Sequence, residues 1–254
     1  MKQILTFLSV FLFVLLTACQ ASPPKDALEA DKEDEDYKNP KYPDLEAVDL
    51  GLSVKWGSKN LDVRCLTRYT DYYAWGEVEI KDNYDWSTYN WGRDYHYYIQ
   101  TATYSVTLTK YNTSEEFGGV DNKTVLDAED DVARVELGGK WRIPTKEEWE
   151  ELEKDCEWTY YRYPNNDPTH NGWIVKSKKN GNQIFLSTLY GLRAGDGPVW
   201  DIFWSWYWTS SLFSEDPRNA WVYVVSDPEE TRIQANYFDY TERSFGLCIR
   251  PVTK

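Results

Sequence analysis

Cysteine and histidine are the residue types in this sequence with the clearest potential for metal binding or covalent chemistry. The chain of 254 residues contains Cys19, Cys65, Cys156 and Cys248, and its histidines are His96 and His170. No two cysteines have the C-x-x-C spacing of common structural zinc sites. We therefore expect no metal and no other cofactor.

The three cysteines after residue 19 are candidates for disulfide bonding. In an oxidising compartment, one disulfide bond and one free thiol is the simplest arrangement of three cysteines. Cys156 stands where a predicted helix ends, so we expect it to take part in the bond. Its partner is either Cys65 or Cys248, and the spacing leaves both open.

Motifs of the common catalytic classes are missing. The sequence has no G-x-S-x-G, no H-E-x-x-H and no Walker A loop. It contains 42 acidic residues, but nothing selects a pair for glycoside hydrolysis. The formal charge of −14 and the lack of any Lys/Arg block argue against nucleic acid as a partner. We therefore predict that the protein is not an enzyme.

Two C-terminal segments combine aromatic and polar side chains that suit ligand binding. Exposed Trp and Tyr rings can stack on sugars, and Asp, Asn and Arg can bond to hydroxyls. The alternative is that these aromatic residues pack inside the protein, as one set in the alternating run 205–208 must. The candidates are Asp196, Trp200, Asp201 and Trp204 in segment 191–204, and Asn236, Tyr237, Tyr240 and Arg243 in segment 226–244.

Three aspartates could be mistaken for a calcium site. Asp127, Asp130 and Asp131 lack the EF-hand spacing and its glycine. We interpret them as the N-cap and first-turn acids of a helix over 127–137, which Gly138-Gly139 ends.

The N-terminus has the features of an export signal. Lys2 precedes an apolar run from Ile4 to Leu16, which is short for a membrane span. The run ends in Leu16-Thr17-Ala18-Cys19, which resembles the lipobox of bacterial lipoproteins. That resemblance implies cleavage after residue 18 and lipidation of Cys19, which anchors the protein in a membrane. An ordinary secretory signal with a chance cysteine is the alternative.

Residues 19–44 are expected to be a lipidated cysteine followed by a disordered tether. Prolines and the acidic stretch 31–36 leave few residues for a core. An acidic stretch soon after the cysteine also resembles the signal that exports Bacteroidetes lipoproteins to the cell surface. A plain spacer on a periplasm-facing anchor is the alternative. We expect the folded domain to cover residues 45–254.

The best-specified element of that domain is a helix that starts after Thr145. Thr145 and Glu148 have the T-x-x-E spacing of a capping box. Trp149, Leu152 and Cys156 follow on one face, which predicts burial. Trp141, before the cap, is also expected in the core.

The other predicted elements are mainly strands. Asn180-Gly181 lies between apolar runs and predicts a hairpin of 173–177 with 183–186. Gly51 predicts a bulge within a strand over 48–56. Further strands are predicted at 207–211, 220–225 and 245–252, separated by irregular loops at 191–204, 212–219 and 226–244.

Several of these motifs occur together in one known family. They are Val48-Asp-Leu-Gly-Leu-Ser-Val-Lys-Trp56, Asp71-Tyr-Tyr-Ala-Trp-Gly-Glu77, Leu126-Asp-Ala-Glu-Asp-Asp-Val-Ala133, Gly138-Gly-Lys-Trp-Arg-Ile-Pro-Thr145, Tyr207-Trp-Thr-Ser-Ser211 and Ile249-Arg-Pro-Val252. In this order they resemble the Fibrobacter succinogenes major paralogous domain of Bacteroidetes lipoproteins. That family is akin to the Legionella collagen-like C-terminal domain.

The resemblance implies an α+β, C-type-lectin-like fold, with two short helices packed on small twisted antiparallel sheets and long loops. A lectin-like fold also suits a binding or adhesion role, because it presents loops on a rigid scaffold. Two positions depart from the family pattern. Ser58 and Lys59 stand where members carry a cysteine, and Cys248 stands where serine is usual.

We consider three functions. The first is an outer-membrane, surface-exposed lipoprotein with a non-catalytic domain for a glycan or protein ligand; the Glu-Pro-Asn and Gln-Pro-Asp calcium signatures of sugar-binding C-type lectins are absent. The second is a structural or fimbria-associated assembly subunit. The third is an oxidase like the formylglycine-generating enzymes, which hold copper with two thiolates. Cys248 is suitably placed for that role, but no second cysteine is close in sequence.

Overall fold

A computed structural model describes residues 41–61, 71–163, 170–189, 191–199, 203–231 and 236–254. This part of the chain has an α+β architecture of small antiparallel sheets with a few short helices, which confirms the predicted class at that level. No helix within it is long and apolar enough to span a membrane.

The central sheet has the order β10–β11–β12 and is antiparallel throughout. Its strands are β10 (Trp204–Leu212), β11 (Asn219–Ser226) and β12 (Asn236–Glu242). The middle strand, β11, buries both faces. Val222 and Val224 belong to one hydrophobic cluster, and Tyr223 and Val225 belong to another. This explains its nearly continuous apolar sequence.

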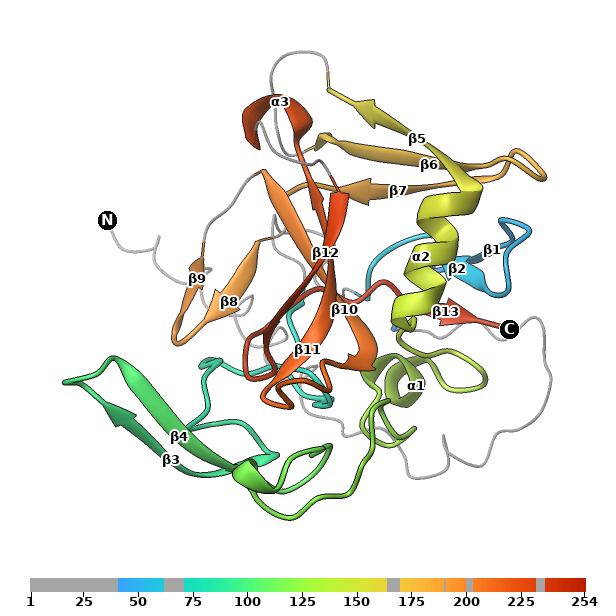
Figure 1. Cartoon of the computed structure of the whole chain (residues 1–254). Helices are drawn as coiled ribbons and strands as arrows, with labels where there is room; N and C mark the ends of the chain where they lie inside the picture. The colour runs from blue at the N-terminus through green and yellow to red at the C-terminus, as the bar shows by residue number, and fades with distance from the viewer. Residues whose placement is uncertain (1–40, 62–70, 164–169, 190, 200–202, 232–235) are drawn as a thin grey trace, which may run out of the picture.

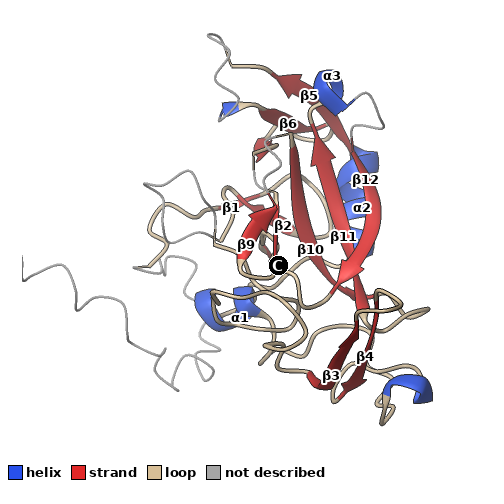
Figure 2. Ribbon diagram, turned by 90° about the vertical axis from the view of Figure 1, so that its left-hand side faces the viewer, coloured by secondary structure: helices blue, strands red, loops and turns tan. Residues whose placement is uncertain are grey.

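The other sheets surround the central one. Figures 1 and 2 place the β5–β7 sheet and the β3–β4 hairpin at opposite ends of it. The pairings are β1 (Ala47–Val48) and β13 (Val252–Thr253) on β2 (Lys55–Gly57), β3 (Gly92–Tyr98) with β4 (Thr103–Leu108), β5 (Cys156–Tyr161) and β7 (Gln183–Ser187) on β6 (Gly172–Ser177), and β8 (Leu192–Ala194) with β9 (Gly197–Val199).

Helix α2 (Lys146–Asp155) packs on β10 and β11. Its capping box is confirmed: the Thr145 hydroxyl accepts from the Glu148 amide, and the Glu148 carboxylate accepts from the Thr145 amide at 2.9 Å. Trp149 is fully buried, and its ring stacks on Tyr223 with centroids 4.7 Å apart. Trp141 is only partly buried.

Helix α1 (Val132–Leu137) is shorter than the predicted 127–137. Asp131 is its N-cap and accepts from the amides of Ala133, Arg134 and Ile143. Residues 128–130 form a turn before it. The helix therefore begins at the only one of the three aspartates whose side chain caps it. A one-turn 3-10 helix, η2 (Glu115–Phe117), and α3 (Pro228–Thr231) complete the described helices.

The predicted hairpin around Asn180-Gly181 is confirmed as β6 and β7, with Gly181 at φ +79°. The strands at 207–211 and 220–225 are also confirmed, within β10 and β11. The prediction of a single strand over residues 48–56 was wrong. Gly51, at φ +69°, lies in the connection between β1 and β2, which pair with each other.

The loop and strand predictions near the C-terminus need correction. Segment 226–244 contains α3 and the seven-residue β12, and segment 191–204 contains the β8–β9 hairpin. Of the predicted strand 245–252, only Val252 belongs to a ladder. Within the rest of that segment, Gly246, Leu247 and Cys248 form isolated bridges, such as Tyr73 with Leu247. Tyr42 packs in the core, so the folded part reaches back beyond the predicted start at Leu45.

Candidate functional site

Tyr240 is the one predicted ligand residue of β12 whose side chain is well exposed, at 48%. It pairs in register with Trp221 of β11, and its ring stacks on Phe213 with centroids 4.0 Å apart and planes 7° apart. The Trp221 ring meets Phe213 edge-on at 5.0 Å. Phe238 lies two residues before Tyr240, on the same face of β12. We call Phe213, Trp221, Phe238 and Tyr240 the aromatic surface.

Three residues of the aromatic surface lie on strands and Phe213 directly follows β10, so the sheet holds these rings in place. Phe238 packs against the buried Tyr223, with centroids 4.9 Å apart. Phe213 and Trp221 are half-buried and support the exposed ring of Tyr240. A partly exposed ring on a rigid support is a suitable platform for a flat apolar ligand face.

Lys146, the first residue of α2, covers one end of the aromatic surface. Its ammonium lies 4.9 Å from the Trp221 centroid and 4.7 Å from the Phe238 centroid. It also forms an ion pair with Glu150, one turn later in the helix. The charge of this lysine is therefore satisfied within the protein.

Glu242 lies at the other end of the aromatic surface, two residues after Tyr240 on β12. Its carboxylate accepts from the Trp86 indole at 3.0 Å and from Tyr104. Burial raises the pKa of Glu242, while these two hydrogen bonds and the charge of Arg218 oppose that shift. Arg218 is itself held by Asp216, with Nε–Oδ1 and Nη2–Oδ2 distances of 2.9 and 2.6 Å.

Beyond Glu242, the β3–β4 hairpin continues the aromatic character of this region. The Tyr104 ring lies 6.0 Å from those of Trp86 and Tyr95. Tyr97 pairs in register with Tyr104 and is half-exposed. At the hairpin tip, Ile99 is 80% exposed.

Arg243 was predicted to bind ligand, and the structure contradicts this. Its side chain is fully buried, between the rings of Trp75 and Tyr89, and Nη1 donates to the Tyr111 carbonyl at 2.9 Å. Burial also lowers the pKa of this arginine. Arg243 therefore supports the core and does not reach a surface ligand.

The other predicted ligand residues are spread over different elements. Asp196 is exposed in the turn between β8 and β9, whereas Trp204 is half-buried at the start of β10 and packs on the core. Asn236 and Tyr237 are half-buried on β12, and Tyr237 also packs on the core. Trp200 and Asp201 lie outside the described residues.

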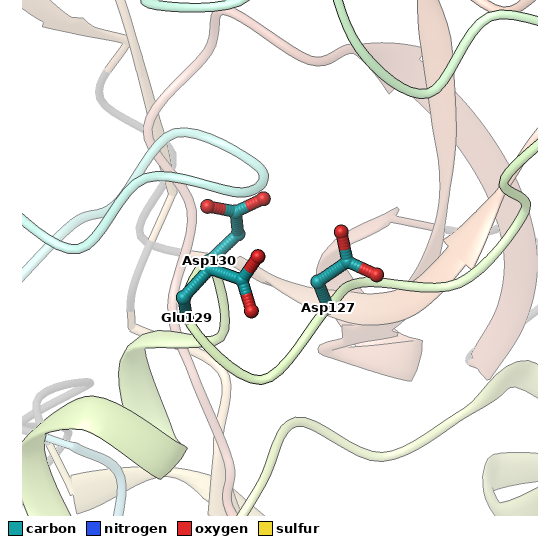
Figure 3. Close-up of side chains that lie close together, drawn as sticks. All are labelled: Asp127, Glu129 and Asp130. Carbon is teal, nitrogen blue, oxygen red and sulfur yellow. The ribbon is translucent and has the colours of Figure 1, made fainter. Parts of the chain in front are cut away.

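Three carboxylates in the turn before α1 are grouped closely enough to suggest a cation site (Figure 3). They belong to Asp127, Glu129 and Asp130, and the Lys110 ammonium lies 2.7 Å from Asp127 and 2.5 Å from Asp130. The Tyr111 hydroxyl also donates to Asp130. Lys110 thus already forms ion pairs within this cluster and offsets part of its negative charge, so the cluster acts as a structural tie.

Cys156 and Cys248 are both buried in the cluster around Trp149. Within the described residues no disulfide bond joins them, which contradicts one of the two predicted pairings. Burial raises the pKa of Cys156 to about 11, so its thiol is protonated at neutral pH. Cys65, the other predicted partner, and the predicted lipidation site Cys19 lie outside the described residues.

None of the protein-family models, curated proteins or solved structures compared with this chain matches it. The assignment of function therefore depends on the geometry of the site and on the sequence motifs.

Proposed function

We propose that this protein is an outer-membrane lipoprotein, anchored through Cys19, whose folded domain is displayed at the cell surface and binds a ligand without catalysing a reaction. The domain belongs, in this proposal, to the Fibrobacter succinogenes major paralogous family and has its C-type-lectin-like fold. The motif order and the arrangement of short helices on small antiparallel sheets support that assignment.

The ligand class that fits best is a glycan. The observation that carries this proposal is the aromatic surface: Tyr240 is half-exposed, backed by Phe213 and Trp221, and followed on the same strand by Glu242. Pyranose rings have an apolar face that packs on an aromatic ring and hydroxyls that bond to carboxylates. Both kinds of partner are present within one short segment of β12.

The test is glycan-array screening of the soluble domain, followed by calorimetric titration of any glycan that binds. Tyr240→Ala removes the exposed ring and should weaken binding by tenfold or more, because aromatic stacking contributes on the order of 1–3 kcal/mol when a ring is truncated. Tyr161→Ala is the matched control, since Tyr161 is similarly exposed but lies on β5.

Two results would count against the proposal. One is that the folded wild-type domain binds no glycan on the array. The other is that Tyr240→Ala and Tyr161→Ala bind as tightly as the wild type, which would place the ligand elsewhere.

A further inference from the structure

We propose that the aromatic surface selects uncharged glycans over anionic ones, because the cations beside it are already paired with acids of the chain, while the half-buried side chain at its end, Glu242, is itself acidic. This inference rests on the proposed function. It adds the chemical class of the ligand: neutral sugars in place of uronic acids, sialic acids or sulfated sugars.

Lys146 is the cation closest to the rings. Its ammonium holds the Glu150 carboxylate and lies over Trp221 and Phe238. To bind an anionic sugar, it would have to share or give up the pairing with Glu150. The pair is electrically neutral as a unit, so it provides no net attraction for an anion.

Arg218 is the cation closest to Glu242. The Nε and Nη2 edge of its guanidinium is occupied by Asp216, in the two-point geometry that a sugar carboxylate or sulfate would need. The guanidinium also lies 4.5 Å from the Phe117 centroid and 5.4 Å from the Tyr104 centroid. The edge of the Arg218 guanidinium that could bind an anion at two points is therefore already occupied within the protein.

The remaining described arginines of these elements do not face the surface. Arg243 is fully buried. Arg93 is exposed on β3, but it pairs in register with Thr107, which lies on the hairpin face opposite Tyr104 and Val106. In the part of the chain that the structure describes, neither arginine offers an anion a contact beside Tyr240.

Glu242 adds the selective element. When ionised, this carboxylate repels an anionic sugar, whereas it accepts hydrogen bonds from neutral hydroxyls. The formal charge of −14 acts in the same direction, although salt screens it beyond about 8 Å at physiological ionic strength. Short-range pairing and long-range charge thus both disfavour an anionic ligand.

The experiment compares neutral and anionic forms of the same backbone on the wild-type domain. Suitable pairs are dextran with dextran sulfate, methyl-esterified with de-esterified homogalacturonan, and desulfated with native carrageenan. A broad panel of neutral glycans is tested alongside them. We expect the neutral member of any bound pair to bind at least tenfold more tightly, with an affinity that changes less than twofold between 50 and 500 mM NaCl.

Glu242→Gln separates charge from shape, because the amide keeps an acceptor oxygen and removes the charge. The ratio of anionic to neutral affinity should rise by about threefold or more, as expected for two charges a few ångströms apart in water. Circular dichroism confirms that the variant is folded.

The outcomes distinguish this inference from the proposed function. If anionic members bind as tightly as neutral ones and Tyr240→Ala removes that binding, the selectivity is refuted while glycan binding stands. If Glu242→Gln leaves the ratio unchanged, Glu242 is not the selective group and the inference fails in its present form. If no glycan of either kind binds, both proposals fall.

Discussion

Asp131 shows how a single buried side chain can connect two elements. It caps α1 by accepting from two of the first helical amides, and its second oxygen accepts from the Ile143 amide at 2.8 Å, just before α2. Burial is the larger influence on this carboxyl and raises its pKa to about 6, although the three hydrogen bonds oppose the shift. The effect of burial on the pKa of Asp131 is therefore larger than the effect of its capping hydrogen bonds.

This shift predicts a pH-dependent contribution to stability. The folded pKa of about 6 exceeds the unfolded value of about 3.9, so the folded state favours the protonated carboxyl. The contribution of Asp131 is thus fully present below about pH 4 and is lost as pH rises through about 6. Its size is on the order of 1–3 kcal/mol.

Denaturant unfolding of the wild type and of Asp131→Asn between pH 4 and pH 7 measures this contribution. The asparagine does not titrate, and it keeps one acceptor oxygen of the two that Asp131 uses, so the lost hydrogen bonds add a cost that does not depend on pH. Subtracting the two curves cancels the other carboxyls of the protein. A difference in unfolding free energy that is constant across this range would contradict the assignment to Asp131.

Among the elements, α2 combines local signals with an ion pair to Arg142, which lies outside the helix. Glu148 serves the capping box and also forms a two-point pair with Arg142, in which Nη1–Oε2 is 2.7 Å. The side chain of Thr145 contributes one group to the cap, its hydroxyl, which accepts from the Glu148 amide. The two residues therefore have separable roles.

Replacing Thr145 with Ala should lower the free energy of unfolding by about 1 kcal/mol, since the Glu148 amide loses its acceptor. Chemical denaturation measures the change. Thr145→Ser is the matched control because it keeps the hydroxyl, and it should stay within a few tenths of a kcal/mol of the wild type. Equal destabilisation by both variants would show that the cap is not responsible.

The elements that the sequence predicted well are those determined by residues close together in the chain. The cap at Thr145 and the turn at Asn180-Gly181 depend on residues only a few positions apart. Strand β12 was predicted as loop because Asn236 and Asp239 are poor strand formers. Its seven residues are instead fixed by pairing with β11, across a connection whose length and contacts no local pattern reveals.

The residues of the candidate site were likewise predicted only in part. Tyr240 could be proposed from residue type, but type alone gave Arg243 equal weight, and the structure buries that arginine completely. Trp221 and Phe238 were missed because they become neighbours only through the register of β11 and β12. Phe213 was missed because the end of β10 brings its ring onto Trp221 and Tyr240. Trp221 and Tyr223 are two residues apart, as are Phe238 and Tyr240, so each pair shares one face of its strand. This spacing was the available signal once the strands were known.

At the scale of the whole molecule, the central sheet joins the two largest hydrophobic clusters. Val222 and Val224 of β11 enter the cluster that contains Trp75, and Tyr223 and Val225 enter the cluster that contains Trp149. Since consecutive residues of one strand serve both clusters, loss of packing in either cluster exposes one face of β11. We therefore expect the two clusters to unfold together.

Trp149→Ala tests this cooperativity. Trp149 is fully buried against Trp56 and Tyr223, so its truncation should cost roughly 3–5 kcal/mol. Because both clusters share β11, far-UV and near-UV circular dichroism should report one transition at the same lowered denaturant midpoint. Val224→Ala, on the opposite face of the strand, should shift both signals together by a smaller amount. Separate midpoints for the two signals in either variant would mean that the clusters unfold independently and that the sheet does not couple them.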